Sequence, residues 1–244
     1  MSVSGIGILN SNAWCVELYS CDNVDISGIK IISARPNGDG ISVQSCRNVT
    51  VRDSFIRTWD DSLVVKNYSN RKGSDSADIL FDGCQLWTDL AQSMEIGYET
   101  NKGGKLKPTI QNVTFSNITV LHNFHKPVMS IHNADDAEVS GILFRDITVD
   151  LEEPQKISGF GILLNPRQIW NARTQDVEVQ TSDDGEEFTT LLPTQTVEFD
   201  PVTDNRCYLP LDESVQARYL RFVFTANSGA DAGQAAEIEV YKAK

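Results

Sequence analysis

The sequence predicts an all-β protein in two parts, a short parallel β-helix followed by an antiparallel β-sandwich. Three observations carry this prediction. Five segments within residues 21–150 share one pattern, in which two short alternating runs follow Asn, Asp or Gly. No segment of helical length carries apolar residues at the i, i+3, i+4 spacing of a helix. Longer alternating strands replace the repeat near residue 155.

The repeat has one apolar marker position in each unit. It is occupied by Val24, Val49, Ile79, Val113 and Ile142, at intervals of 25, 30, 34 and 29 residues. A second series of short strands precedes it, in AWCVELYS, NGDGISVQS, WDDSLVVKN, AQSMEIGYE and HKPVMSIHN. Each coil therefore holds about three strands joined by tight turns, and we expect about five or six coils. Equivalent residues of successive coils stack about 4.8 Å apart.

The second part of the chain has the pattern of a sandwich. Its longer alternating segments are separated by turn signals at 183–185 and 228–229. We place the boundary at 153–157, which divides the chain into a β-helix over 1–154 and a sandwich over 155–244. The segment ITVDLEEPQKISGF fits both the end of a coil and a strand of the sandwich.

The composition excludes several classes of partner. The 244 residues include 21 Lys and Arg against 34 Asp and Glu, a net charge of −13. Such a chain repels phosphate backbones and anionic lipid, so we expect neither nucleic acid nor membrane insertion. The N-terminus lacks the basic and apolar regions of a signal peptide. The five cysteines include no CxxC pair, and we expect no metal site.

Two acidic segments align on neighbouring coils. When Ile41 is placed over Leu63, Asp39 falls over Asp61, with Asp60 beside them. Stacked carboxylates raise one another's pKa, which suits a catalytic site that needs one acid protonated and another ionised. The alternative is that these acids only shape turns, as Asp often does. Consecutive strand residues point to opposite faces, so Asp60 and Asp61 can share a cleft only if the strand begins with a turn or bulge.

These segments resemble a known family. NGDG and WDDSLVVK are similar to the Asn-Thr-Asp and Asp-Asp motifs of polygalacturonase-type glycoside hydrolases, and dextranase-type β-helical hydrolases carry a similar trio. The resemblance covers about residues 5–150 and implies a right-handed parallel β-helix that hydrolyses a glycosidic bond with inversion and without a cofactor. Asp60 would be the general acid, and Asp39 and Asp61 would activate water. Inverting pairs normally stand about 6.5–9.5 Å apart.

The departures from the family motifs concern the sugar. Gln92 stands where pectin hydrolases have the His of Gly-His-Gly, and Ser130-Ile131-His132 replaces Arg-Ile-Lys. We therefore expect a neutral sugar rather than a uronate. The expected substrate contacts are Lys66, Gln92, Glu95, His125, His132 and Trp59. His122, His125 and His132 are all expected to face the cleft.

The C-terminal part also has a resemblance. KISGFGILLNPRQ, DVEVQTSDDGEEFTTL and ARYLRFVFT are similar to the latter part of a discoidin-type, galactose-binding-like module, which implies an incomplete antiparallel jelly-roll β-sandwich. Together the two resemblances imply an extracellular or periplasmic enzyme, acting as a monomer on a poly- or oligosaccharide. Two rivals stay open: a binding or adhesion protein with an inactive Asp cluster, and a polysaccharide lyase that uses Ca²⁺ and a basic residue. Lys66 is the only basic residue near the acids, which disfavours the lyase.

Overall fold

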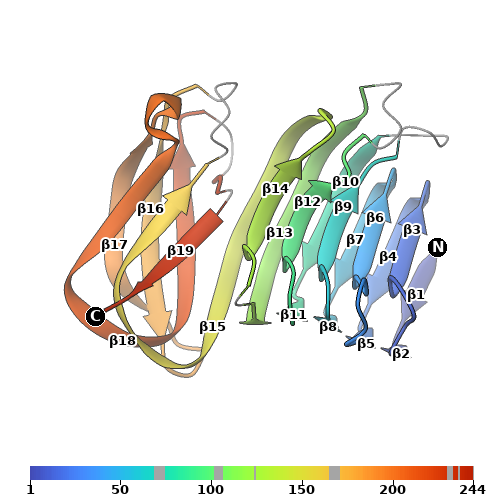
Figure 1. Ribbon diagram of the computed structural model, residues 1–244, viewed down its shortest axis with the longest axis horizontal. Coiled ribbons are helices and arrows are strands. Elements are labelled where there is room, and N and C mark those ends of the chain that lie inside the picture. The colour runs from blue at the N-terminus through green and yellow to red at the C-terminus, as the bar shows by residue number, and fades with distance from the viewer. Residues whose placement is uncertain are drawn as a thin grey trace.

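The computed structural model describes residues 1–68, 75–101, 107–123, 125–164, 171–229, 233–235 and 237–243. It shows two regions side by side, a β-helix that contains the N-terminus and a curled antiparallel sheet that contains the C-terminus (Figure 1). The predicted all-β class is confirmed, because the described chain is built of strands with one short 3-10 helix. Among these residues, no helix has the length and apolar character needed to cross a membrane.

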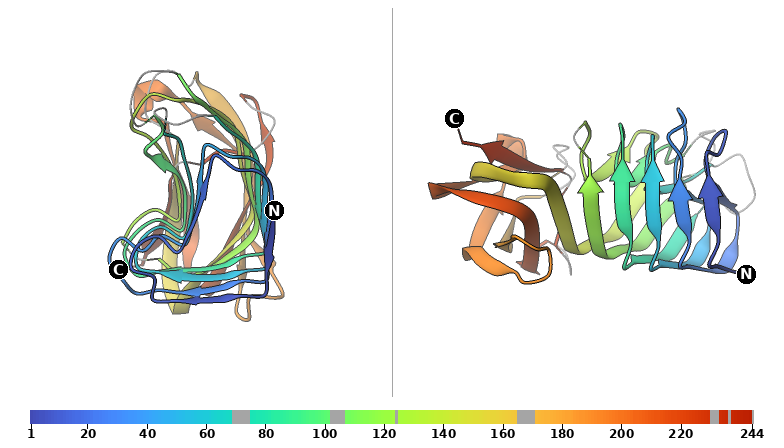
Figure 2. Two further views of the ribbon diagram at one scale, coloured as in Figure 1. Left: turned by 90° about the vertical axis from the view of Figure 1, so that its right-hand side faces the viewer. Right: turned by 90° about the horizontal axis from the view of Figure 1, so that it is seen from below.

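Fourteen short or medium strands build the β-helix. They are β1 (Ser2–Ser4), β2 (Gly7–Leu9), β3 (Val16–Tyr19), β4 (Asp22–Ser27), β5 (Lys30–Ile32), β6 (Ile41–Gln44), β7 (Arg47–Arg52), β8 (Phe55–Thr58), β9 (Leu63–Lys66), β10 (Ser76–Asp82), β11 (Gln85–Thr88), β12 (Met94–Tyr98), β13 (Thr109–His122) and β14 (Met129–Asn133). Seen along its axis, successive coils lie over one another (Figure 2).

The coils form three walls of parallel strands. A five-stranded sheet runs in the order β14-β12-β9-β6-β3. The strands β2, β5, β8 and β11 form a second wall, and β1, β4, β7 and β10 form a third. Both of these walls continue into β13, whose first half pairs with β10 and whose second half pairs with β11. The predicted parallel β-helix is therefore confirmed.

Residues of one kind stack inside the coils. Phe81, Phe115 and Phe144 lie on successive coils with ring centroids 4.9 and 5.0 Å apart. The marker residues Val24, Val49, Ile79, Val113 and Ile142 are all buried and pair in register. This stacking removes a continuous column of apolar surface from water, which is the main favourable term in the fold.

The bends between walls use residues that tolerate left-handed backbone. Asn48, Asn112 and Asn117 have φ of 53°, 54° and 52°. Asn adopts this region more readily than other non-glycine residues, because its short polar side chain forms local hydrogen bonds. Asn48 donates to Asp22, Asn112 to Asp78 and Asn117 to Asp82, each on the preceding coil. The polar corners are thus structural, as the repeat indicates.

The C-terminal region is a curled antiparallel sheet in the order β17-β16-β18-β15-β19. Its elements are β15 (Glu138–Leu163), β16 (Arg173–Ser182), β17 (Thr189–Phe199), η1 (Pro201–Thr203), β18 (Arg206–Asn227) and β19 (Glu237–Lys242). The predicted turn signals at 183–185 and 228–229 lie directly after β16 and β18. Phe160 and Phe222 meet edge to face at 5.4 Å in the core.

One strand joins the two regions. β15 pairs in parallel with β13 from Glu138 to Val149, and its antiparallel pairing with β18 shifts register between Asp150 and Gln155. Ile147, Thr148 and Val149 pair with both β13 and β18, so the segment 147–160 begins in the last coil and continues in the sandwich. The proposed division at 154/155 falls inside this single strand.

Candidate active site

The mouth of the five-stranded sheet carries the predicted acidic row. Ile41, Leu63 and Met94 are register partners on β6, β9 and β12. Asp39, Asp61 and Gln92 each lie two residues before these partners, and Gly40 and Ser62 donate backbone hydrogen bonds to the carbonyls of Asp61 and Gln92 at 2.8 and 3.0 Å. The alignment made from the sequence is therefore the spatial one, and Gln92 follows the two acids.

A turn brings Asp60 to the same place. β9 begins only at Leu63, so the residues before it are free of strand alternation. The carbonyl of Asp60 accepts hydrogen bonds from the hydroxyls of Thr58 at 2.7 Å and Thr88 at 2.8 Å. The Asp61 amide donates to Oδ1 of Asp60 at 3.0 Å. As a result, one carboxylate oxygen each from Asp39, Asp60 and Asp61 lies within 4.8 Å of the others.

Lys66 neutralises part of this acidic charge. Its Nζ lies 3.2 Å from Oδ2 of Asp39 and 3.4 Å from Oε2 of Glu99, and it lies 4.8 Å from the ring centroid of Trp14. The side chains of Lys66 and Asp39 are only 7% and 3% exposed. An ammonium group buried this deeply gains strongly from a carboxylate partner, because water does not screen the pair.

Burial and mutual repulsion raise the pKa values of the acids. For Asp39, burial raises the pKa to about 7, against the lowering effect of Lys66, and Asp61 and Asp60 add to the rise. For Asp61, burial raises the pKa to about 6, again opposed by Lys66 and increased by Asp60. Burial alone would lower the pKa of Lys66, but Asp39, Glu99 and Asp61 raise it above its ordinary value. Lys66 is therefore an ammonium ion at neutral pH.

A fourth carboxyl group lies beneath Asp61. Glu95, on β12, is 2% exposed and is hydrogen-bonded to the Asp61 side chain. Burial, together with Asp61, raises the pKa of Glu95 to about 9. Gln92 also contacts both Asp61 and Glu95. Its backbone N–H donates to Oδ1 of Asp61 at 3.1 Å, and its side-chain Nε2 donates to Oε1 of Glu95 at 3.4 Å. Glu95 was expected to contact sugar, but the structure buries it on the next coil, in contact with Asp61.

The other expected contacts divide between the site and elsewhere. Trp59 is half-buried in the turn next to Asp60. The His132 side chain is 52% exposed, and its Nδ1 lies 3.9 Å from Oε1 of Glu95. His125 is exposed and lines a separate cavity, described below.

The expectation that all three histidines face one cleft is wrong for His122. Its ring stacks on Trp87 at 4.7 Å, and its Nδ1 lies 2.5 Å from Glu152. Trp87 alternates with the buried Leu86 on β11 and therefore points outward from the second wall. The three histidines are close together in the sequence, but the chain bends between walls after β13, so His122 lies on a different face of the β-helix.

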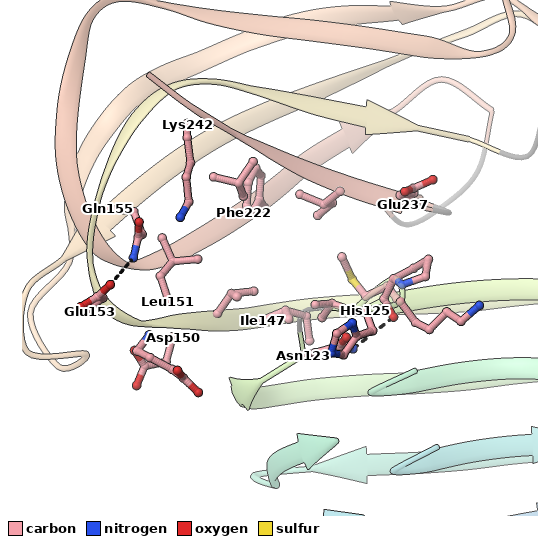
Figure 3. Close-up of a pocket in the computed structure, with 18 residues that line it drawn as sticks. Asn123, His125, Ile147, Asp150, Leu151, Glu153, Gln155, Phe222, Glu237 and Lys242 are labelled. Atoms are coloured by element: carbon pink, nitrogen blue, oxygen red, sulfur yellow. Dashed lines mark hydrogen bonds between the residues drawn. The ribbon is translucent and has the colours of Figure 1, made fainter. Parts of the chain in front are cut away.

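A large cavity lies between the β-helix and the sandwich. Its volume is about 900 Å³. Figure 3 shows Lys242, Gln155 and Phe222 on the sandwich side, and Ile147, Asn123 and His125 on the side of the last coils. None of the three aspartates lines it. Apolar side chains such as Met129, Ile147 and Leu151 form much of its lining.

Two site residues were missed from the sequence. Trp14 lies in the same row as Asp39, since Cys15 donates its amide to the Asp39 carbonyl at 2.8 Å. The alignment of AWCV with GDGI contains this signal. Glu99 contacts Lys66 from beyond the end of β12, and no spacing rule places a residue that follows a strand end.

The arrangement suits acid–base chemistry. The raised pKa values of Asp39 and Asp61 mean that one of these two carboxyl groups can hold a proton near neutral pH while the other is ionised. Three carboxylates can also ligate a divalent cation, but the Lys66 ammonium already compensates Asp39 at the same place. The residues present therefore fit proton transfer better than metal binding.

Comparisons with known proteins agree with this fold. A family model described as glycosyl hydrolases family 28 matches residues 1–166, and a model described as F5/8 type C domain matches residues 130–238. The two matches overlap over residues 130–166, which include the whole of β15, the strand shared by both regions.

Several polygalacturonases are similar to the chain. A probable endopolygalacturonase D of Neosartorya fischeri is 28% identical over 166 residues, which cover 61% of this chain and 32% of the relative. A polygalacturonase of Prunus persica is 29% identical over 47% of this chain and 28% of the relative. The crystal structure of a hyperthermoactive exopolygalacturonase from Thermotoga maritima aligns with a TM-score of 0.39 and 26% identity, over 52% of this chain and 32% of that one.

The chain thus spans about a third of the length of the curated relatives it matches. Its match to the family 28 model nevertheless extends over more than half of its residues and includes the whole acidic row. This protein belongs to family 28 of the glycosyl hydrolases.

Proposed function

We propose that the chain hydrolyses O-glycosidic bonds of a uronic-acid polysaccharide of the polygalacturonate type. Asp60 is the general acid that protonates the leaving oxygen, and Asp39 and Asp61 activate the attacking water. The observation that supports this proposal most strongly is the convergence of the three carboxylate oxygens within 4.8 Å. A turn alone has no reason to bury and stack acids in this way, because each ionised neighbour makes the others harder to ionise.

The raised pKa values supply both forms of carboxyl group. Burial raises the pKa of Asp39 to about 7 and that of Asp61 to about 6, so between these values Asp39 is mostly protonated and Asp61 mostly ionised. In the proposal, the proton held on Asp39 is passed within the trio to Asp60, which delivers it to the leaving oxygen and leaves Asp39 free to accept from the water. Asp60 is the most accessible member, because it is half-buried while Asp39 and Asp61 are 2% and 7% exposed. An accessible acid suits contact with the glycosidic oxygen.

The separation of the acids bears on stereochemistry. At 4.8 Å or less, the oxygens are closer than the about 6.5–9.5 Å usual for inverting enzymes. Two oxygens at this separation can both accept a hydrogen bond from one water, since each bond is about 2.7–2.8 Å long. In the proposal, Asp39 and Asp61 therefore hold the water together, and Asp60 acts on the other side of the bond, which gives inversion.

The choice of a uronate revises the neutral sugar expected from the motifs. The similar curated proteins are named polygalacturonases. This chain also presents basic side chains on the coils beyond the acids, where a uronate carboxylate could contact them. They are His132, which is 52% exposed, and the exposed His125 and Lys126. Action outside the cytoplasm, a monomeric state and glycan binding by the C-terminal region are further parts of the proposal.

The lyase alternative needs a basic residue that can remove a proton. Lys66 does not suit that role, because its raised pKa keeps it an ammonium ion and its Nζ is held by Asp39 and Glu99. The binding-protein alternative predicts that the acids can be replaced without loss of function. Both alternatives are separated from hydrolysis by the experiment that follows.

The test compares polygalacturonate with a panel of neutral polysaccharides, using release of reducing ends by the full chain at pH 6. We expect release from polygalacturonate, with no unsaturated product absorbing near 235 nm, and the same rate after chelation of divalent cations. Unsaturated product or a Ca²⁺ requirement would favour the lyase. Binding without cleavage by the folded chain would favour the binding protein, and cleavage of only neutral polymers would reject the uronate.

The stereochemical part has its own readout. Proton NMR of the first product formed from an oligogalacturonate distinguishes the two anomers before they interconvert. The proposal expects the anomer opposite to that of the substrate. The same anomer as the substrate would show that one of the closely spaced acids acts as a nucleophile, and would overturn the water-sharing role of Asp39 and Asp61.

A further inference from the structure

Glu95 is a buried carboxyl group that the hydrolytic scheme above does not use. It lies on β12, one coil beyond Asp61, in a ladder with Val64 and Ser130 on the outer face of the five-stranded sheet. Its neighbours Met94 and Ile96 point into the core. With 2% of its surface exposed, Glu95 is too deeply buried to act as a sugar contact.

The contacts of Glu95 converge on Asp61. The two side chains are hydrogen-bonded, and Asp61 also accepts the amide of Gln92 at 3.1 Å. The other oxygen contacts of Glu95 are the Gln92 side chain at 3.4 Å and Nδ1 of His132 at 3.9 Å. A hydrogen bond between two carboxyl groups requires one proton, since ionised carboxylates only accept.

The contacts assign this proton to Glu95, because Asp61 already accepts the Gln92 backbone N–H at 3.1 Å and is stabilised as an anion by the Lys66 ammonium, whereas Glu95 is 2% exposed. Burial, followed by the charge of Asp61, raises the pKa of Glu95 to about 9, whereas that of Asp61 is raised only to about 6. Between these values Glu95 is a neutral donor and Asp61 an ionised acceptor. The charged groups that act on the pair are Asp39, Asp60 and Lys66 from the neighbouring coils, with His132 at the edge.

We propose that Glu95 is a positioning residue for the hydrolytic reaction: its carboxyl group donates a hydrogen bond to Asp61 and orients the Asp61 carboxylate toward the attacking water. The inference rests on the proposed function of the trio. Together with the Gln92 amide, Glu95 provides a second donor to Asp61, so the carboxylate is held by two bonds. Donors to the ionised form also keep Asp61 ionised in a site whose burial and other acids oppose ionisation.

The first test measures the hydrogen bond without relying on activity. Carboxyl carbons are followed by ¹³C NMR through a pH titration of the full chain, in wild type, Glu95→Gln and Glu95→Leu. Gln keeps an N–H donor for Asp61, and Leu keeps the volume without a donor. We expect Asp61 to titrate about 1 pH unit higher in Glu95→Leu and close to its wild-type value in Glu95→Gln.

A matched control comes from the same ladder. Glu17 occupies the corresponding outward position on β3, three coils before Glu95, and is exposed. Glu17→Gln is expected to leave the Asp61 titration unchanged. An Asp61 titration that is identical in wild type and Glu95→Leu, or shifted equally in the Gln and Leu variants, overturns the inference.

The second test measures kcat on polygalacturonate against pH. Glu95→Leu loses a hydrogen bond to a charged group, and we expect its kcat to fall by about 10- to 100-fold. The acidic limb of its kcat–pH profile should also move to higher pH. Glu95→Gln should keep most of the wild-type kcat and leave the acidic limb of the pH profile at its wild-type position. Equal losses in both variants without a shift of the limb would mean that Glu95 only fills space. No hydrolysis by folded wild type rejects the proposed function itself, whatever the titration shows.

Discussion

Two ion pairs on different walls of the β-helix have the same spacing and opposite surroundings. Lys66 pairs with Asp39 across 27 residues at 3.2 Å, and Arg52 pairs with Asp25 across 27 residues at 3.1 Å. The first pair has side chains 7% and 3% exposed, and the second has side chains 47% and 38% exposed. The repeat places both pairs on adjacent coils. The main difference between them is burial.

This difference explains where chemistry can occur. Water screens Arg52 and Asp25, so their ion pair contributes little to the stability of the fold. At the mouth of the five-stranded sheet, burial is the largest cause of the raised pKa values of Asp39 and Asp61. Stacking brings acids together on either wall, but only a wall that excludes water turns them into a site that shares protons.

The largest contrast is expected in the reaction rate. Asp61→Asn removes a group that activates water and should lower kcat on polygalacturonate by about 10²- to 10⁴-fold. Asp25→Asn, in the exposed pair, should change kcat by less than about twofold. Reducing-end assays on variants whose circular dichroism matches wild type provide the measurement. Similar effects of the two substitutions would remove the distinction between the walls.

Stability should show the next largest contrast. Lys66→Met leaves Asp39 buried without its cation and should lower the free energy of unfolding by about 3–5 kcal/mol. Arg52→Met should lower it by about 0–1 kcal/mol. Urea unfolding at pH 7 compares the two. Adding Asp39→Asn to Lys66→Met should recover much of the loss, and no recovery would show that Lys66 acts through packing rather than through charge.

A smaller change in the free energy of unfolding is expected when the pH is raised. The folded-state pKa values of Asp39, Asp61 and Glu95 are raised to about 7, 6 and 9, so the folded chain keeps protons that the unfolded chain releases. Their contribution to stability is complete below about pH 4 and is lost as pH rises through these values. We expect Asp39 alone to account for a loss of about 2–3 kcal/mol between pH 5 and 8. Urea unfolding at both values should show a smaller loss in Asp39→Asn, and an equal loss would contradict the assignment.

The smallest effect is expected at the second wall. His122 stacks on Trp87 and pairs with Glu152, so His122→Ala should change kcat and KM by less than about twofold. His132→Ala should raise KM for polygalacturonate by about five- to tenfold, as expected for loss of one contact to a charged group. Steady-state kinetics of the two variants gives the comparison. A larger kinetic effect of His122→Ala than of His132→Ala would indicate that the substrate binds at the second wall rather than at the five-stranded sheet.

The position of the trio could be predicted from the sequence because a parallel β-helix converts repeat position into spatial position. Once Ile41 is aligned with Leu63, Asp39 must lie beside Asp61, and the register confirms it. The turn before Leu63, which lets Asp60 join them, also follows from the requirement that both acids face one side.

Other features depend on three-dimensional packing that spacing does not encode. Glu95 has the correct ladder position, but its burial under Asp61 results from side chains of neighbouring coils. His122 lies only ten residues before His132, yet the bend after β13 separates their walls. β15 continues through the predicted boundary because its two halves find different partners, β13 and then β18.

The central claim is that the buried row on the five-stranded sheet binds and cleaves the polysaccharide. A crystal structure of the full chain carrying Asp60→Asn, with an oligogalacturonate bound, tests it most directly. The account predicts a sugar lying across β6, β9 and β12, with a glycosidic oxygen within hydrogen-bond distance of residue 60 and a water between Asp39 and Asp61. A sugar bound only in the cavity between the last coil and the sandwich would contradict it.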